Sequence, residues 1–407
     1  MARARRALER EKRKLNLVKV FIAILLLVII IVSIYFIFKN FGKDNNQKLD
    51  NNQDVNNNQE NQVTTNQIEE NKPKTIEQVV SDFGGIITEY VREDTAYLTK
   101  EGKEYTAYTN GEIVDGKILP WGGGSKEPKA DKSGNIDIYT ADELKWFADQ
   151  VISGEKNFAG VTIALKNNID LGARKNNQGN WEGTNWNAII GFLDELPEKS
   201  ENKNTTNSNN VSENGIEQEN LKRFAGIFDG NGFWIRGMSI NSDKRYQGLF
   251  GYQTGTIKNL TIKNSNVTGG EAVAAIVGFN GGMISNCNIE DVVISGTEKV
   301  GGIAGITAPS SKIENCMVNN EKCNIKGQNY VAGIVGYANN NTVILNSKNN
   351  GKIEGNNYIA GICGIIFYGS TISDCSNESL VLGKEYVGGI VGYSRGSSRE
   401  SFFFTKS

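Results

Sequence analysis

A four-residue motif that begins with Gly or Ala and ends with Gly recurs six times in the second half of the chain. Its copies occupy residues 248–251, 275–278, 302–305, 333–336, 361–364 and 389–392. Their final glycines are separated by 27, 27, 31, 28 and 28 residues. A nearly constant period of this length is typical of stacked-repeat architectures, in which each repeat packs only on its neighbours.

Apolar residues recur at fixed positions relative to each motif. Two residues before the final glycine stand Leu249, Ile276, Ile303, Ile334, Ile362 and Ile390. Five residues before it stand Tyr246, Val273, Val300, Val331, Ile359 and Val387. Two further sets follow the motifs, namely Ile257, Ile284, Ile313, Ile344 and Ile372, then Val267, Ile294, Ile325, Ile353 and Val381. Because most of these residues are β-branched, they predict about three short strands per repeat.

Such strands can bury their apolar sides only by stacking on one another. Repeats stacked about 4.8 Å apart pair each strand with its copies above and below, so that like side chains form vertical files. We therefore predict a mainly β fold, a right-handed parallel β-helix (β-solenoid), over residues 135–393. This fold requires Ile276, Ile303 and Ile334 to lie in one file.

A helix is predicted over residues 140–151, just ahead of the repeats. Thr140 and Glu143 have the spacing of a capping box, in which each side chain satisfies a backbone N–H of the first turn. The helix also carries an apolar stripe, Leu144, Phe147, Ala148 and Val151. We expect this capping helix to cover the N-terminal end of the solenoid, where strand edges would otherwise be open.

The N-terminus predicts a membrane anchor. Residues 20–38 carry no charge and are about long enough to cross a bilayer as one helix. Residues 1–19 carry a net charge of +6, which favours a cytoplasmic N-terminus and an extracellular remainder. A cleaved secretory signal is the alternative, although its apolar region would be shorter. Residues 39–73 follow as a disordered linker, since Asn and Gln dominate them and little is apolar.

The other regions are less regular. Residues 74–134 predict a small α+β lead-in, with a helix within 76–90 and a hairpin about residues 100–103. Residues 161–165 and 187–191 have the composition of strands, and 194–222 form a polar insertion thrown out as a loop. Residues 394–407 contain three consecutive phenylalanines, and we interpret them either as a tail that covers the end of the coil or as a truncated cap.

Cysteine and histidine usage limits the chemistry. Cys287, Cys316 and Cys375 occupy equivalent places in successive repeats, and Leu260 and Ser347 fill the same place elsewhere. A position shared by these residue types predicts a small buried site rather than a disulfide or a metal ligand. The chain has no histidine, which excludes His-dependent zinc and Ser-His or Cys-His catalysis. We expect no cofactor, and the acidic excess after residue 19 argues against nucleic-acid binding.

The repeats resemble the GLUG-motif repeats of Gram-positive surface proteins. The resemblance covers about residues 136–393 and includes the segments 139–144, 168–172 and 228–232 together with the six motif copies. In that family the repeats occur in adhesin-like proteins and in the non-catalytic regions of immunoglobulin A peptidases. The resemblance therefore implies a repeat architecture and a place at the cell surface. The chain lacks a His-Glu-x-x-His zinc motif, so no peptidase activity is implied.

The residues after each motif form the candidate binding site, a possible ligand-stacking ladder of Tyr252, Phe279, Ile306, Tyr337, Ile365 and Tyr393. Facing outward, it would stack on sugar rings, and packed inward it would be part of the core. We expect a non-catalytic adhesion or display module for cell-wall or host glycans or proteins. The alternatives are a structural envelope protein, a piece of a larger surface protein, or a polysaccharide-cleaving enzyme, for which Asp170 and Asp229 are the candidate acids.

Overall fold

The computed structural model describes residues 74–92, 94–109, 111–176, 178–193 and 221–396. The chain divides into two units, 1–72 and 73–407, and the second contains all of the described residues. The predicted cytoplasmic tail, membrane segment and linker lie outside them, as does nearly all of the predicted C-terminal tail. Within the described ranges, no helix is both long enough and apolar enough to span a membrane.

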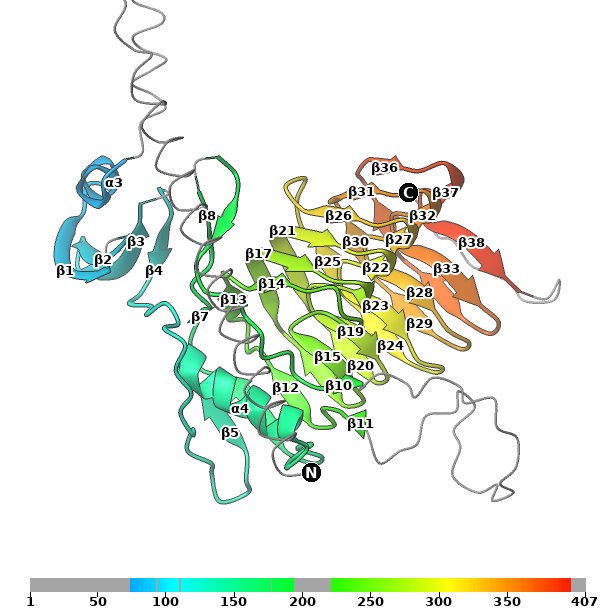
Figure 1. Cartoon of the computed structure of the whole chain (residues 1–407), viewed down its shortest axis with the longest axis horizontal. Helices are drawn as coiled ribbons and strands as arrows, with labels where there is room; N and C mark the ends of the chain where they lie inside the picture. The colour runs from blue at the N-terminus through cyan, green and yellow to red at the C-terminus, as the bar shows by residue number, and fades with distance from the viewer. Residues whose placement is uncertain (1–73, 93, 110, 177, 194–220, 397–407) are drawn as a thin grey trace, which may run out of the picture. The chain divides into compact units, whose positions relative to one another are not determined.

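Most of the described chain forms a parallel β-solenoid of about eight turns (Figure 1). One sheet, called sheet one, stacks a single strand from each turn. It contains β5 (Ile136–Ile138), β6 (Thr162–Leu165), β12 (Ile227–Asp229), β16 (Thr256–Lys258), β20 (Met283–Ser285), β24 (Lys312–Glu314), β29 (Val343–Leu345) and β34 (Thr371–Ser373). Every neighbouring pair in this sheet is parallel.

Two further sheets complete most of each turn. Sheet two contains β7 (Ile169–Asp170), β13 (Trp234–Arg236), β14 (Ser239–Asn241), β17 (Thr261–Thr268), β21 (Asn288–Ser295), β25 (Met317–Val318), β26 (Asn324–Lys326), β30 (Lys348–Asn349), β31 (Lys352–Glu354), β35 (Ser376–Asn377) and β36 (Val381–Leu382). Sheet three contains β15 (Phe250–Gln253), β19 (Val277–Asn280), β23 (Ala304–Thr307), β28 (Val335–Ala338), β33 (Cys363–Phe367) and β38 (Val391–Arg395).

A fourth sheet shows that a turn holds more strands than the three we predicted. Sheet four contains β18 (Glu271–Val273), β22 (Glu298–Gly301), β27 (Asn329–Ala332), β32 (Asn357–Ala360) and β37 (Glu385–Gly388). Sheet two also has an inward file that the sequence did not reveal, Ile262, Ile289, Val318, Asn349 and Asn377. The file changes from apolar to Asn in the last turns, where the Asn349 amide donates to Asn377 Oδ1 at 2.7 Å.

The predicted vertical files are confirmed. The N–H of Val277 donates to the carbonyl of Ile303 at 3.1 Å, and that of Ala304 donates to the carbonyl of Ile334 at 3.0 Å. The file that starts at Ile257 pairs in register through sheet one, and the structure extends it backward through Phe228. The side chains of these files form the main core, which is closed to solvent in the interior turns.

One member of the predicted files is wrong. Tyr246 does not align with Val273, because Gln247 forms the bridge to Val273 and the first turn is one residue shorter there. The Tyr246 N–H instead donates to the carbonyl of Glu271 at 2.8 Å. Because this turn lacks one residue, the position five residues before the glycine is not equivalent here to the same position in the other turns.

The predicted capping helix is confirmed as α4 (Ala141–Ser153), and both halves of its capping box form. Its apolar stripe is buried in the main core. Phe147 packs against the rings of Phe158, Phe224 and Phe228, with centroids 5.1 to 5.9 Å apart. The helix directly follows β5, the terminal strand of sheet one, and lies at that end of the stack in Figure 1.

The lead-in contains one helix and an antiparallel sheet. The helix is α3 (Ile76–Phe83), and the strands, in order, are β1 (Ile86–Arg92), β2 (Thr95–Lys100), β3 (Lys103–Tyr108) and β4 (Ile113–Asp115). Gly84 has a left-handed backbone and ends the helix after Phe83. The helix therefore occupies only the first part of the predicted range 76–90, and β1 occupies the remainder. The hairpin is confirmed, since Lys100 pairs with Lys103 across two left-handed residues.

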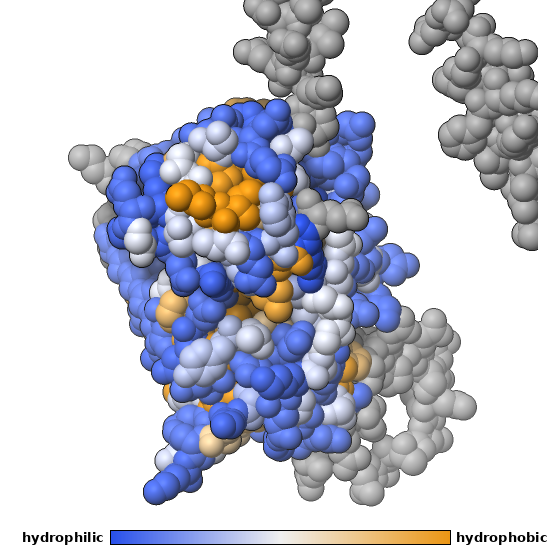
Figure 2. Space-filling view, turned by 90° about the vertical axis from the view of Figure 1, so that its left-hand side faces the viewer, coloured by the Kyte–Doolittle hydropathy of each residue, from blue (hydrophilic) through white to orange (hydrophobic). Residues whose placement is uncertain are grey.

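Figure 2 shows the side of the molecule that faces left in Figure 1, which is mainly hydrophilic and carries separate orange patches. Large apolar side chains of the lead-in that are exposed include Ile86 and Leu119, at 72% and 64%. Isolated apolar residues of this kind are normal on a protein surface and carry no argument for a binding site.

The polar insertion begins and ends at adjacent points of the coil. Strands β10 (Phe192–Leu193) and β11 (Leu221–Lys222) pair antiparallel at its base, and residues 194–220 lie outside the described ranges. The strand expected at 187–191 does not form, since only Ile190 makes a bridge, to Phe250. A second small antiparallel pair joins β8 (Arg174–Lys175) and β9 (Trp181–Glu182).

Candidate functional site

The predicted ladder forms a continuous file along sheet three. Tyr252 pairs with Phe279, and the register continues through Ile306, Tyr337, Ile365 and Tyr393. None of these side chains belongs to the main core, and Phe279, Ile306 and Tyr337 pack in a separate cluster. In each of the first five strands the next residue is fully buried, so strand alternation turns the ladder to the outer face. We call this file the outer ladder. Its two isoleucines are each 6% exposed, whereas Tyr393 is 39% exposed.

A second file, which the sequence did not reveal, packs over the outer ladder. It consists of Tyr246, Ala272, Lys299, Tyr330, Tyr358 and Tyr386, whose φ angles all lie between 54° and 63°. We call it the left-handed file. A left-handed backbone costs an L-residue with a bulky side chain roughly 1–2 kcal/mol. The signal available in the sequence was the recurrence of Tyr at 330, 358 and 386, one residue before the apolar file of sheet four.

The two files form one aromatic strip on the outside of the coil. The rings of Tyr330 and Tyr358 stack with centroids 4.8 Å apart, and those of Tyr358 and Tyr386 stack at 4.7 Å. The outer ladder meets these rings edge-on, with Tyr337 5.7 Å from Tyr330 and Tyr393 5.4 Å from Tyr386. Nearer the N-terminus, Phe279 contacts both Tyr246 and Tyr252. Each turn therefore contributes to the same surface, which is named here the aromatic strip.

Partial burial keeps the tyrosines of the strip uncharged. It raises the pKa values of the Tyr246, Tyr252, Tyr330 and Tyr337 hydroxyls above their usual range. At physiological pH these phenols are therefore neutral and can both donate and accept hydrogen bonds.

Polar residues border the strip, at the position before each member of the left-handed file. These residues are Arg245, Glu271, Glu298, Asn329, Asn357 and Glu385. Glu271 makes ion pairs with Lys299 and with Arg245, the latter at 3.0 Å. Further along, the Asn357 amide donates to Asn329 Oδ1 at 3.0 Å, and the Asn329 amide donates to Glu298 at 3.1 Å. The border is thus charged in the first turns, carries two amides in the middle, and ends in Glu385.

Asp170, a candidate acid, is enclosed in an ionic cluster. Its carboxylate accepts hydrogen bonds from Tyr108 at 2.8 Å, from Arg174 at 2.9 Å and from Arg236 at 3.2 Å. Burial acts to raise the pKa of Asp170, but the charges of Arg236 and Arg174 outweigh it, so the net shift is downward. The side chain is 1% exposed. This cluster joins Tyr108 of the lead-in to the first turns of the solenoid.

Asp229, the other candidate acid, is held in a turn. Its carboxylate accepts hydrogen bonds from the Asn231 N–H at 2.9 Å and from the Asn259 amide at 3.0 Å, and it pairs with Lys258 at 3.1 Å. Burial acts to raise the pKa of this carboxyl, but these hydrogen bonds and the lysine lower it overall. Asp170 and Asp229 lie in different sheets, each with its own partners, so they do not form one carboxylate pair.

All five cysteines are free and buried. This confirms the small buried position predicted from Cys287, Cys316 and Cys375, which is also occupied by Leu260 and Ser347. The Cys316 N–H donates to the Ser347 hydroxyl on the next turn at 3.2 Å. Burial raises the pKa of Cys375 to about 11, so its thiol is protonated at neutral pH. Within the described ranges, no group of three or more His, Cys, Asp or Glu residues could hold a metal ion.

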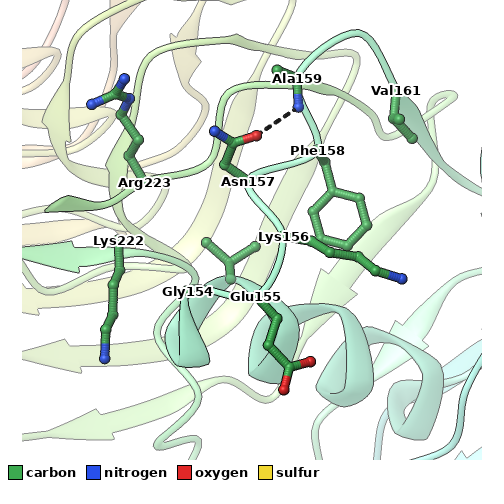
Figure 3. A pocket seen from close by; sticks show the side chains of 10 residues that line it. Gly154, Glu155, Lys156, Asn157, Phe158, Ala159, Val161, Lys222 and Arg223 are labelled. Carbon is green, nitrogen blue, oxygen red and sulfur yellow. Dashed lines mark hydrogen bonds between the residues drawn. The ribbon is translucent and has the colours of Figure 1, made fainter. Parts of the chain in front are cut away.

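Two hollows lie near the N-terminal end of the coil. One, of about 430 Å³, lies at the C-terminal end of α4 and is lined in part by Lys156, Lys222 and Arg223 (Figure 3). Figure 3 shows these cations pointing in different directions, and Asn157 accepting a hydrogen bond from the Ala159 N–H at 3.0 Å. The other, of about 480 Å³, includes Tyr97 and Tyr139 in its lining.

Comparison with known proteins gives little further information. No family model matches the chain, and no curated protein matches it. One similar solved structure is described as a "putative immunoglobulin A1 protease" from Bacteroides ovatus, with 16% sequence identity and a TM-score of 0.39. The similarity covers 67% of this chain and 86% of that chain. At these values the likeness says nothing about the activity or partners of this protein.

Proposed function

We propose that this protein is a non-catalytic binding module that displays the aromatic strip to an extended partner at the cell surface. The observation that carries the proposal is the outward direction of the outer ladder and of the left-handed file on successive turns. Stacked repeats offer long regular surfaces that suit extended partners. Aromatic rings bury a large area with little loss of conformational freedom, and the tyrosines add a polar edge.

The cellular setting in this proposal rests on the sequence. An uncharged segment at 20–38 behind a basic N-terminus suits a single-pass anchor, with the solenoid outside the cell. The resemblance to GLUG-motif repeats and a right-handed coil belong to the same proposal. Cell-wall glycans, host glycans and host proteins are the partners that it implies, in an adhesion or display role.

A polysaccharide-cleaving enzyme is the less favoured alternative. Glycoside hydrolysis uses two carboxylates on opposite sides of the scissile bond, both of which must reach the substrate. Asp170 is buried in its ionic cluster, and Asp229 is held by the turn that it stabilises. The described geometry therefore favours binding over catalysis.

The test is binding of the full-length protein, in detergent or nanodiscs, to isolated cell walls, a glycan array and host surface proteins. We expect retention on at least one of them, and a loss of about tenfold in affinity for Tyr337→Ala, because aromatic contacts at interfaces carry about 1–3 kcal/mol. Tyr139→Ala is the matched control, since Tyr139 is 52% exposed but lies outside the strip.

Two results would contradict the proposal. Equal binding by Tyr337→Ala and the unmodified protein would show that the strip is not the binding surface. Absence of binding to every surface would favour a purely structural envelope role.

A further inference from the structure

The residue types in the left-handed file are not those that its backbone prefers. Asn, Asp and Gly tolerate a left-handed backbone best, whereas large side chains are strained there. This chain follows that preference at another corner of the coil, which uses Asn259, Asn286, Asn315, Asn346 and Asp374 at φ angles of 48° to 54°. The corner of the left-handed file requires the same backbone, yet it carries tyrosine at four of six turns. Backbone conformation therefore does not account for the tyrosines.

Stacking between turns does not account for them fully either. The Asn corner also links neighbouring turns, since the Asn286 amide donates to Asn259 Oδ1 at 3.1 Å. A less strained ladder that connects the turns was thus available within the same molecule. A strained residue type at a position where a less strained type would also link the turns points to function. What tyrosine adds over asparagine is an aromatic ring and a hydroxyl group at the surface.

The surroundings of these rings select for an uncharged ligand. Tyr330 and Tyr358 are half-buried beside the Asn329 and Asn357 amides, and Tyr386 is 50% exposed. Carboxylates border this stretch at both ends, Glu298 on one side and Glu385 on the other. They would repel an acidic polymer. Amides and neutral phenols offer both donors and acceptors, which hydroxyl-rich ligands require.

We propose that the C-terminal half of the strip, around Tyr330, Tyr358 and Tyr386, binds a neutral polysaccharide laid along the stack. This inference rests on the proposed binding function and names its ligand class. Tyr330, Tyr358 and Tyr386 stack face to face, so they present ring edges and hydroxyls to a ligand that lies along the stack. Sugar hydroxyls would hydrogen-bond to these phenols and to the bordering amides. The rings repeat every 4.7 to 4.8 Å, comparable to the length of one sugar unit. Successive sugars would therefore meet successive turns.

The experiment measures binding of the full-length protein to immobilised neutral polymers, namely a β-glucan, a mannan and an N-acetylglucosamine polymer. Polygalacturonate serves as the acidic comparison. We expect at least one neutral polymer to bind at least tenfold more tightly than polygalacturonate. Tyr358→Asn should reduce that binding at least tenfold while the Tm stays unchanged or rises, because Asn relieves the backbone strain.

Asn315→Gly is the matched control. Asn315 has the same left-handed backbone, with φ of 53°, but it lies exposed at the Asn corner, outside the strip. We expect this variant to retain neutral-polymer binding within about twofold. If Tyr358→Asn fails to fold, Tyr358→Phe decides the question, because it keeps the ring and removes only the hydroxyl. The inference then requires weaker binding at an unchanged Tm.

Three outcomes would overturn the inference. They are unchanged neutral-polymer binding by Tyr358→Asn, unchanged binding by Tyr358→Phe where the first variant is unfolded, and equal loss of binding by Asn315→Gly. Binding only to a protein or to an acidic polymer, still weakened by Tyr337→Ala, would also overturn it but would leave the proposed function standing. Failure of the ligand class and failure of the binding role are therefore distinguishable.

Discussion

At the scale of single residues, the molecule compensates the buried charges of Asp170 and Arg236 closely. Asp170 lies between the guanidinium groups of Arg174 and Arg236, and the ring of Tyr108 lies within 4.4 Å of both guanidinium carbons. Removal of one partner of a buried ion pair leaves the others desolvated and uncompensated. The cluster is therefore a point at which a conservative substitution has a large effect.

Asp170→Asn should lower the free energy of unfolding by about 3 kcal/mol at neutral pH, because it leaves Arg174 short of its counter-charge. Urea unfolding of the full-length protein would measure this. Asp137→Asn is the control, since its pair with Lys166 is exposed and such pairs contribute under about 1 kcal/mol. Similar losses in the two variants would contradict a structural role for the cluster.

The same carboxyl group predicts a pH dependence. The pKa of Asp170 is lower in the folded protein than in the unfolded chain, where it is about 3.9. Its ionised form therefore contributes stability above about pH 4, and this contribution is lost as the pH falls through the folded pKa. Over that acidic range, the unmodified protein should lose stability more steeply than Asp170→Asn in urea titrations. Parallel curves would contradict the assignment.

Cysteine reactivity tests the buried position in the files. A protonated, buried thiol reacts slowly with disulfide reagents, since the thiolate is the reactive form. In the native protein at mildly alkaline pH, Cys363 and Cys375 should stay unmodified for much longer than an unfolded control. All five thiols should react in concentrated guanidinium without a reductant. Fewer than five would indicate a disulfide and contradict the free cysteines.

At the scale of elements, a few side chains of α4 hold the first turns together. Phe147 contacts Phe158, Phe224 and Phe228, which come from two segments, one before the polar insertion and one after it. Phe147→Ala should lower the free energy of unfolding by about 3–5 kcal/mol through the cavity that it leaves. Lys145→Ala on the same helix should cost under about 1 kcal/mol, because Lys145 has only a partly exposed pair with Asp149. Chemical denaturation with a helix signal would distinguish the two variants.

The elements also show what the sequence could predict. Files of β-branched residues at a constant period predicted sheets one and three, part of sheet two and the main core, because register in a solenoid follows side-chain type. Helix α4 was evident from its cap and stripe. The inward file of sheet two was not predicted, because Asn349 and Asn377 replace its apolar residues in the last turns. These two side chains hydrogen-bond to each other between turns, which the sequence does not show. Tyr246 was misplaced because one deletion shifts the count.

The candidate site was predictable only in part for a related reason. The outer ladder follows the motif at a fixed distance, so its alignment could be predicted from spacing alone. The left-handed file could not, because its members range from Ala to Lys to Tyr and share only a backbone angle. The partners of Asp170 could not be predicted from the sequence either, because they are distant along the chain. Tyr108 is 62 residues away and Arg236 is 66 residues away in sequence.

At the scale of the whole stack, the turns differ in protection although their backbone is the same. Val331 in an interior turn is closed to solvent, whereas Val387 at the equivalent position of the last described turn is 45% exposed. Hydrogen exchange should therefore be slowest in the middle turns and fastest in β36 to β38, as expected when unfolding begins at an end. Mass spectrometry of peptides would measure the gradient. Equal protection of β27 and β37 would contradict it.

The short antiparallel pair of β10 and β11 has a practical consequence. It brings Leu193 and Leu221 opposite each other, so that the chain leaves and re-enters the coil at one place. The entropic cost of closing a loop depends only weakly on its length. Because β10 and β11 already hold the two ends together, a change within the loop should have little effect on the coil. Replacement of residues 194–220 by a foreign peptide, an epitope or a small domain should thus leave the turns intact. This position is therefore suited to the insertion of foreign sequences.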